Sequence, residues 1–214
     1  MAGRIERADH PLGERRWVSG AGRAAKVSHD GGLACAVRYP PRMTDQPEKL
    51  VTPAIEALDA AGVAYTVVRT EIARSAEESA AFQGIPVGSL LRSILVRKSA
   101  DDFLFVLVPG GRRFNWPKLR QLLGTNRLTL PTEEEAKAET GYVRGAITPF
   151  GARRPWPVIA DASIETLDVV AIGGGARGVN VHLAPADLVA ATSAQVVDIT
   201  VPEEPRTDAP STAS

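Results

Sequence analysis

Helix-start and helix-stop signals recur at short intervals along residues 43–200, and they leave room only for short helices and short strands. The pair Thr52-Pro53 predicts an N-cap followed by a proline in the first helical turn, and Gly62 predicts the end of that helix. The same signals predict further helices from Ser75 to Gly84, from Asn115 to Gly124, from Thr132 to Gly141 and from Pro185 to Val189.

Short β-branched stretches fill the gaps between these helices. They predict strands over residues 65–68, 91–97, 103–108, 127–130, 158–161, 168–172, 179–183 and 195–199. Helices and strands do not alternate regularly, and a hairpin-length loop joins residues 91–97 to residues 103–108. This order favours an α+β domain built on a mixed sheet or partial barrel over a doubly wound fold.

The two ends of the chain differ in composition from residues 43–200. Residues 1–42 are rich in Gly, Arg and Ala without an apolar period, which is typical of disorder. Since a well-patterned domain begins directly after Met43, we expect residues 1–42 to be a disordered extension or a mis-called start. Residues 201–214 are rich in Pro, Ser and acidic residues and predict a disordered tail.

Composition excludes several classes of protein. Lys plus Arg and Asp plus Glu number 25 each, so the net charge indicates no partner. The single cysteine, Cys35, excludes a disulfide framework within one chain, which fits a reducing compartment. Apolar runs are too short to span a bilayer, and the N-terminus lacks the apolar stretch of a secretory signal. We therefore expect a cytoplasmic protein without a membrane partner.

One glycine-rich motif imitates a nucleotide-binding fingerprint. Residues 173–178 read Gly-Gly-Gly-Ala-Arg-Gly and match G-x-G-x-x-G. The fingerprint binds a pyrophosphate only where a helix starts at the glycines. Here the alternating residues 179–183 follow at once and predict a strand. We therefore interpret the glycines as a β-turn.

Histidines are too few for a catalytic triad or a histidine-rich metal site. His10 and His29 fall in the expected extension, which leaves His182 in the domain. On its predicted strand His182 shares a face with Asn180, so it lies on the surface or lines a pocket.

Residues 140–151 form a segment with three glycines and a proline between a predicted helix and the next strand. Glycines let backbone amides approach a ligand closely, and such a segment can direct N–H groups at a developing oxyanion. Taken alone, the pattern also fits an ordinary surface loop.

The motifs of residues 50–198 carry a resemblance when they are read in order. They are Thr52-Pro-Ala-Ile, Gly62-Val-x-Tyr, Leu91-Arg-Ser-Ile-Leu-Val, Val106-x-x-Val-Pro109, Gly141-Tyr-Val-x-Gly-Ala-Ile-Thr-Pro-Phe-Gly151 and Leu183-Ala-Pro-Ala-Asp-Leu188. The set resembles the YbaK/EbsC family, which includes free-standing prolyl-tRNA editing proteins and the editing domain inserted in many bacterial prolyl-tRNA synthetases. The ordered set is more specific than any one of its motifs.

The resemblance implies a single α+β, mixed-sheet, barrel-like domain with peripheral helices over residues 43–200. It implies an aminoacyl-tRNA deacylase, a hydrolase that needs no cofactor and cleaves the ester of a mischarged tRNA. Typical family substrates are tRNAs for proline that carry alanine or cysteine. The implied partners are the tRNA acceptor end and prolyl-tRNA synthetase.

The resemblance also implies the site residues. A family G-x-x-x-P loop lines the aminoacyl pocket, and Gly145-Ala-Ile-Thr-Pro149 takes its place here. The expected catalytic groups are Arg92 and the backbone of Gly145, Ala146 and Ile147. The expected substrate-binding residues are Tyr142, Gly145, Thr148, Pro149, Gly175 and Arg177. Two aromatic residues, Tyr142 and Trp116, have the same two interpretations. Each either stacks on a terminal base of the tRNA or is an aromatic residue of the core.

Arg92 departs from the family pattern, which often has a lysine at this position. Arginine keeps the positive charge and adds a planar fork, but it cannot exchange a proton near neutrality. Arg92 therefore either orients the ester carbonyl or a phosphate, or is a surface charge on an edge strand. Further arginines form a basic rim for the tRNA end or are scattered over the surface; they are Arg112, Arg113, Arg144, Arg153, Arg154 and Arg177.

Two other functions remain open from the sequence. The departure at Arg92 fits a non-catalytic module that binds an aminoacyl-tRNA end or a small ligand. Hydrolysis of an ester or amide unrelated to tRNA is the third reading.

Overall fold

The structure, a computed structural model, describes residues 50–203. They belong to one of the two units into which the chain divides, residues 46–214. The helices are α1 (Pro53–Ala60), α2 (Ala76–Gln83), η1 (Val87–Ser89), α3 (Trp116–Leu122), α4 (Glu133–Thr140), η2 (Ala162–Thr166) and α5 (Pro185–Thr192). The strands are β1 (Thr66–Arg69), β2 (Leu91–Ser99), β3 (Asp102–Pro109), β4 (Arg112–Phe114), β5 (Val158–Asp161), β6 (Val170–Gly173), β7 (Val179–Leu183), β8 (Gln195–Val197) and β9 (Thr200–Pro202). The predicted extension of residues 1–42 and the predicted start of the domain at Met43 lie outside the described residues. Most of the predicted tail also lies outside them.

Local capping fixes the helix starts where the sequence predicts them. The hydroxyls of Thr52 and Ser75 accept hydrogen bonds from the first turns of α1 and α2. Thr132 and Glu135 form a complete capping box on α4. Gly84 and Gly141 end α2 and α4 in the left-handed conformation, where glycine avoids a steric penalty.

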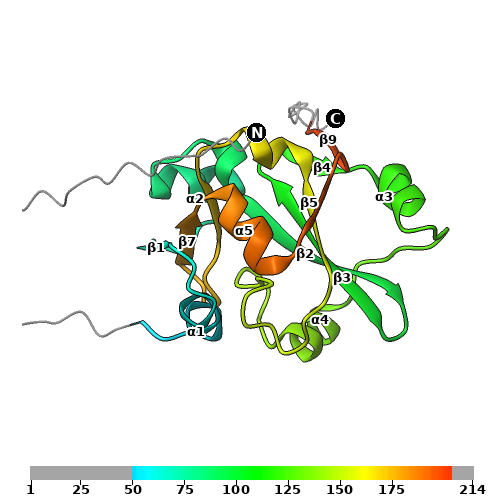
Figure 1. Ribbon diagram of the computed structural model, residues 1–214, viewed down its shortest axis with the longest axis horizontal. Helices are drawn as coiled ribbons and strands as arrows, with labels where there is room; N and C mark the ends of the chain where they lie inside the picture. Colours follow the sequence, from blue (N-terminus) through cyan, green and yellow to red (C-terminus); the bar gives the residue numbers. More distant parts are fainter. Residues whose placement is uncertain (1–49, 204–214) are drawn as a thin grey trace, which may run out of the picture. The chain divides into compact units, whose positions relative to one another are not determined.

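The strands divide among three hydrogen-bonded sheets within the described residues. A four-stranded sheet in the order β2-β3-β5-β8 is mixed, because β2 pairs antiparallel with β3 while β3–β5 and β5–β8 are parallel. An antiparallel sheet has the order β1-β7-β6, and β4 pairs with β9 alone. Figure 1 shows the long β2–β3 hairpin, and β2 contacts β6 of the antiparallel sheet. This arrangement confirms the predicted mixed α+β class.

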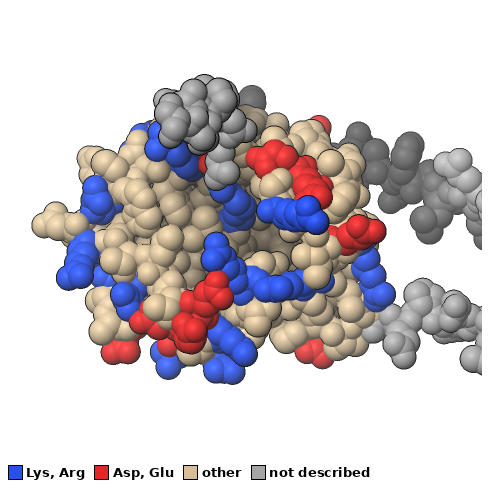
Figure 2. Space-filling model, turned by 180° about the vertical axis from the view of Figure 1, so that it is seen from behind, with Lys and Arg blue, Asp and Glu red and all other residues tan. Residues whose placement is uncertain are grey.

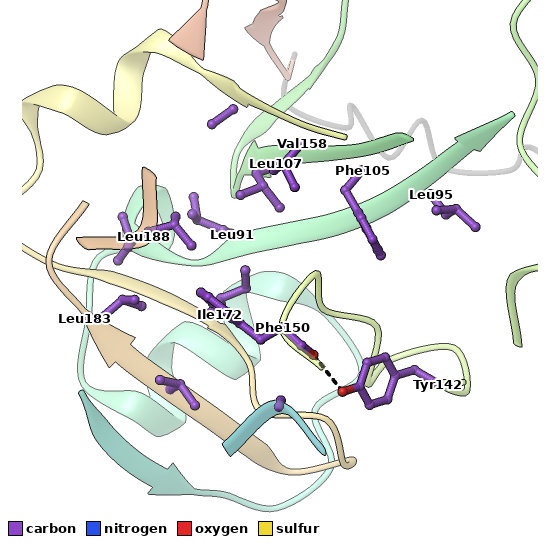
Figure 3. Packing of buried hydrophobic residues seen from close by; sticks show 14 of the residues in the cluster. Leu91, Leu95, Phe105, Leu107, Tyr142, Phe150, Val158, Ile172, Leu183 and Leu188 are labelled. Carbon is purple, nitrogen blue, oxygen red and sulfur yellow. Dashed lines mark hydrogen bonds between the residues drawn. The ribbon is translucent and has the colours of Figure 1, made fainter. Parts of the chain in front are cut away.

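Strand β3, buried from Phe103 to Pro109, separates two hydrophobic clusters, because its side chains alternate between the faces of the sheet. Phe105 and Leu107 pack on one face with Leu91, Ile172 and Leu183 (Figure 3). Residues of the other cluster are Val96, Leu104, Val106, Val108, Leu119, Ile159 and Ile199. The first cluster holds the two larger sheets together and the second attaches α3.

The glycine-rich segment 173–178 is a turn between antiparallel strands β6 and β7, as predicted. Gly174 N–H donates to the Val179 carbonyl over 2.9 Å, and β7 begins at Val179. No helix starts at these glycines, so the nucleotide-binding interpretation is excluded by the structure.

Two strand predictions were wrong. Residues 127–130 form no strand and contribute only a bridge between Thr129 and Arg97. The predicted strand 195–199 is shortened to β8, which ends at Val197, and the separate strand β9 begins at Thr200. At this break the buried Asp161 carboxylate accepts hydrogen bonds from Ile199 and Thr200 N–H. The predicted tail boundary after Thr200 consequently falls inside β9.

Candidate functional site

A pocket of about 670 Å³ lies beside the first half of β2. Its other walls are the start of α2, the start of α4 with the residues before it, and residues 144–147. On the face shown in Figure 2, Lys and Arg side chains gather around a hollow in the surface. The volume is typical of a small-molecule site and leaves room for an aminoacyl group with part of a nucleotide.

The pocket is locally basic although the chain as a whole is neutral. Three arginines line it, namely Arg74, Arg92 and Arg144, against one acidic residue, Glu133, among the described lining residues. Arg144 pairs with Glu133 over 3.0 Å, but the side chains are 79% and 66% exposed. An ion pair this exposed contributes little stability, so a substrate phosphate can compete for Arg144.

The segment 141–151 folds into a braced loop beside the pocket. Gly145 has a φ of 85° and Gly151 a φ of 61°, values that favour glycine. A side chain at Gly151 would overlap the Pro53 carbonyl oxygen at the start of α1. Tyr142 Oη donates to the Phe150 carbonyl over 2.7 Å and ties the ends of the loop together (Figure 3).

The loop leaves several backbone N–H groups without an acceptor among the described residues, and those of Arg144, Gly145 and Ile147 belong to residues that line the pocket. Ala146 N–H donates to the Val143 carbonyl over 3.0 Å and closes a turn. Among the described residues, the N–H groups of Gly145 and Ile147 make no hydrogen bond, and both residues line the pocket. Uncommitted amides beside a pocket are suited to bind a carbonyl or oxyanion oxygen.

Arg92 lines the pocket and is anchored by its guanidinium. Its Nη2 donates to the Arg112 carbonyl and lies 4.0 Å from the Glu203 carboxylate. Arg92 Nε is buried and has no partner in the described structure, so one donor remains for a further ligand.

Three of the predicted site residues meet at the pocket: Arg92, Gly145 and Ile147. Ala146 lies between the two lining loop residues, but its N–H is already bonded to Val143 and is not available as an oxyanion donor in this structure. Arg177 reaches the loop indirectly, because its Nε donates to the Arg144 carbonyl over 3.3 Å.

The structure places Tyr142 in the core rather than in the pocket. The side chain is 5% exposed, and burial raises the pKa of the phenol to about 12, so that it stays a hydrogen-bond donor. The substrate contact expected for Tyr142 is therefore replaced by the brace to Phe150. Trp116, the other aromatic considered for stacking, packs against Phe114.

Three further predicted binding residues also lie outside the pocket lining. Thr148 is fully buried, and its hydroxyl has no partner among the described residues. Pro149 lines a separate cavity of about 620 Å³ that also includes Trp156. Gly175 packs so closely that an added Cβ would lie 3.1 Å from Tyr142 and Ala54 side-chain atoms. These three residues therefore pack on the side of the loop that faces away from the pocket.

Sequence reasoning missed Ser93, whose buried hydroxyl has no partner and which lines the pocket. Its alternation with the buried Leu91 and Leu95 was the available signal, since all three share a strand face. His182 does not line this pocket; its Nε2 lies 2.8 Å from Gln83 Oε1, and burial lowers its pKa.

Within the described residues, no group of three or more His, Cys, Asp or Glu side chains is placed to hold a metal ion. No described helix is long and apolar enough to cross a membrane.

Comparison with known proteins decides the family. The family model of the aminoacyl-tRNA editing domain matches residues 70–191, more than half of the chain. The chain belongs to the aminoacyl-tRNA editing family. All three pocket residues predicted from the sequence lie within the matched span.

Individual members of this editing family show the same relationship. The chain is 24% identical over 139 residues to EbsC of Enterococcus faecalis, a candidate Cys-tRNA(Pro)/Cys-tRNA(Cys) deacylase, covering 65% of this chain and 85% of EbsC. It is 35% identical over 107 residues to the proline–tRNA ligase of Thermosipho africanus, covering 50% of this chain and only 19% of the ligase. A crystal structure of a candidate trans-editing enzyme for prolyl-tRNA synthetase superposes with a TM-score of 0.64 at 27% identity, covering 71% of this chain and 99% of that one.

These findings confirm the predicted YbaK/EbsC-type family, and with it the function of an aminoacyl-tRNA deacylase. The editing domain is thus a hydrolase acting on the ester bond of mischarged tRNA.

Proposed function

We propose that the 670 Å³ pocket is where this deacylase binds and hydrolyses its substrate, a tRNA for proline that carries a small wrong amino acid such as alanine or cysteine. The names of EbsC and of the proline–tRNA ligases among its relatives support this substrate class. The acceptor end of the tRNA is the direct partner, prolyl-tRNA synthetase is the second partner, and the site of action is the cytoplasm.

The observation that carries the proposal is the meeting of two uncommitted amides with a guanidinium in one pocket. Water attacks the ester carbonyl, and the N–H groups of Gly145 and Ile147 stabilise the oxyanion. The carbon–oxygen ester bond then breaks, and the ribose hydroxyl leaves with a proton from water. The products are a free amino acid and an uncharged tRNA.

Arg92 contributes charge rather than proton transfer, because a guanidinium stays protonated near neutral pH. Its free Nε donor and its position on β2 suit it to orient the ester carbonyl or the terminal phosphate. Ser93, with its unpaired hydroxyl, is suited to contact the bound aminoacyl group.

The decisive experiment gives the purified full-length chain a panel of aminoacylated tRNAs. Alanyl- and cysteinyl-tRNA for proline should lose their amino acid well above the uncatalysed rate, whereas correctly charged prolyl-tRNA should not. Hydrolysis of other mischarged tRNAs alone would overturn the substrate class. Saturable binding without hydrolysis of any of them would favour a binding module.

Arg92→Ala should lower kcat/KM by about 10- to 100-fold, as loss of one positioned charged donor does. Arg127→Ala is the matched control, since Arg127 is exposed and does not line the pocket. Equal rates for the Arg92 variant and the control would remove Arg92 from the site.

A further inference from the structure

The small sheet of β4 and β9 stands directly beside Arg92. Antiparallel pairing aligns Arg112 with Pro202, and Glu203 N–H donates to the Gly111 carbonyl over 2.8 Å. The carbonyl of Arg112 in turn accepts the hydrogen bond from Arg92. The backbone group that anchors Arg92 is therefore held in place by the C-terminal strand.

A buried carboxylate fastens this strand to the rest of the domain. Asp161 is 1% exposed and accepts hydrogen bonds from Ile199 N–H, Thr200 N–H and the Thr200 hydroxyl. Arg112 Nε lies 3.6 Å from Asp161 and donates to the Thr200 hydroxyl over 2.5 Å. With its backbone and side chain both engaged, Arg112 cannot easily move away from Arg92.

Glu203 adds a charge to this backbone anchor. Its carboxylate lies 4.0 Å from Arg92 Nη2, with the side chains 44% and 35% exposed. A long arginine side chain loses conformational freedom when it is held in one position, and two anchors on the same guanidinium impose that loss before substrate arrives. β9 and Glu203 lie outside the family-matched residues 70–191.

We propose that the C-terminal strand β9 positions Arg92 for the aminoacyl-tRNA, through Glu203 and the Arg112 carbonyl of its partner strand. Glu203 is a positioning residue that acts on substrate through Arg92. The inference rests on the proposed role of Arg92 at the deacylation site.

A positioning role differs in its kinetics from simple competition with the tRNA. If Glu203 only repelled substrate phosphates, its removal would lower KM and leave kcat unchanged. If Glu203 holds Arg92 in a productive position, its removal lowers kcat, because the guanidinium then samples other positions during the reaction.

The test compares Glu203→Gln, Glu203→Asp and Glu203→Lys in the full-length chain with alanyl- and cysteinyl-tRNA for proline. Glu203→Gln should lower kcat about two- to fivefold, the range for a partly exposed ion pair. Glu203→Lys replaces attraction by repulsion and should lower kcat about tenfold. Glu203→Asp should recover part of the loss, and Glu165→Gln, an exposed control, should change neither constant.

A double variant isolates the route through Arg92. In an Arg92→Ala background, Glu203→Gln should have no further effect on kcat. Additive losses, or a lower KM at constant kcat, would overturn the proposal.

An NMR measurement decides the same question without tRNA. The Arg92 Nε–H resonance, assigned by its loss in Arg92→Ala, should shift in Glu203→Gln and stay in place in Glu165→Gln. If the protein hydrolyses no mischarged tRNA but shows this shift, the proposed substrate is contradicted and the contact between Glu203 and Arg92 is supported. If the enzyme is active but the Arg92 Nε–H resonance does not shift in Glu203→Gln, the positioning role of Glu203 is contradicted and the proposed function is not.

Discussion

Gly145 is needed for its backbone conformation rather than for lack of space. Its φ is 85°, and a Cβ built at this position meets no atom within 4 Å. Any other residue would therefore fit sterically into the surroundings but would disfavour the backbone angle that places the two uncommitted amides beside the pocket.

We expect Gly145→Ala to keep the fold, to cost about 1–2 kcal/mol in unfolding free energy, and to reduce kcat at least tenfold. Gly88→Ala is the matched control, because Gly88 also has open space around its Cβ and no left-handed φ. Deacylation and urea unfolding of both variants check the prediction. An active Gly145→Ala enzyme would argue against the loop amides as oxyanion donors.

Asp161 makes the stability of the domain depend on pH. Burial alone would raise the pKa of Asp161, but hydrogen bonds from Ser163, Thr200 and Ile199 stabilise the carboxylate and lower its pKa below the ordinary value of 3.8. A lowered folded-state pKa means that Asp161 stabilises the fold above about pH 4 and that this stabilisation is lost as pH falls through the folded-state value.

Asp161→Asn should therefore lower the unfolding free energy by about 2–3 kcal/mol at pH 7, as expected for hydrogen bonds to a buried charged group. The difference from the wild type should shrink below about pH 4. Urea unfolding at pH 7, at pH 5 and at about pH 2.5 measures it. A difference that stays constant down to about pH 2.5 would show that the carboxylate charge is not responsible.

At the scale of the element, the capping box of α4 connects stability with the pocket. Thr132 and Glu135 satisfy each other's backbone N–H groups, and Thr132 and Glu133 also line the pocket. Loosening this helix start therefore loosens one wall of the site.

Thr132→Ala should lower the unfolding free energy by about 1 kcal/mol, equivalent to about 2–4 °C in Tm for a domain of this size. Thr132→Ser keeps the capping hydroxyl and should restore most of the loss. Thermal unfolding followed by circular dichroism compares the three proteins. Equal melting of Thr132→Ala and the wild type would mean that the capping box carries no stability.

Helix starts could be predicted from the sequence because capping depends on residues three positions apart. Thr52, Ser75, Asn115 and Thr132 each accept the hydrogen bond that their spacing predicts. The pairing of β4 with β9 could not, because it joins residues almost ninety positions apart, and its strands are only three residues long.

The site was predictable to a similar degree. Ordered motifs indicated Arg92, Gly145 and Ile147, and these three residues line one pocket. The motifs could not distinguish residues that line the pocket from residues that support the loop. Tyr142 lies in the same motif as Gly145, yet its side chain turns into the core, which only tertiary packing decides.

For the molecule as a whole, a net charge of zero is compatible with a locally positive pocket. Lys plus Arg equals Asp plus Glu, yet the pocket lining has three arginines and one glutamate. Binding of a tRNA end should therefore depend on salt although the net charge is zero.

Raising monovalent salt from about 50 to about 200 mM should raise KM for mischarged tRNA roughly tenfold, as expected for contacts to two or three single-stranded phosphates. Changes in kcat should be smaller. Steady-state deacylation over this range measures both constants, with Arg144→Ala expected to flatten the dependence. A KM that does not respond to salt would place the phosphates elsewhere.

The close packing of Gly151 against the Pro53 carbonyl has a consequence for transplanting this domain into other proteins. One end of the described chain supports the loop, and the other end, at Glu203, lies against Arg92. A graft cut to the family-matched residues 70–191 would lose both supports. We therefore expect a portable module to start before Thr52 and to end after Glu203, and a fusion partner at either junction to change catalysis through these supports rather than through contact with the tRNA.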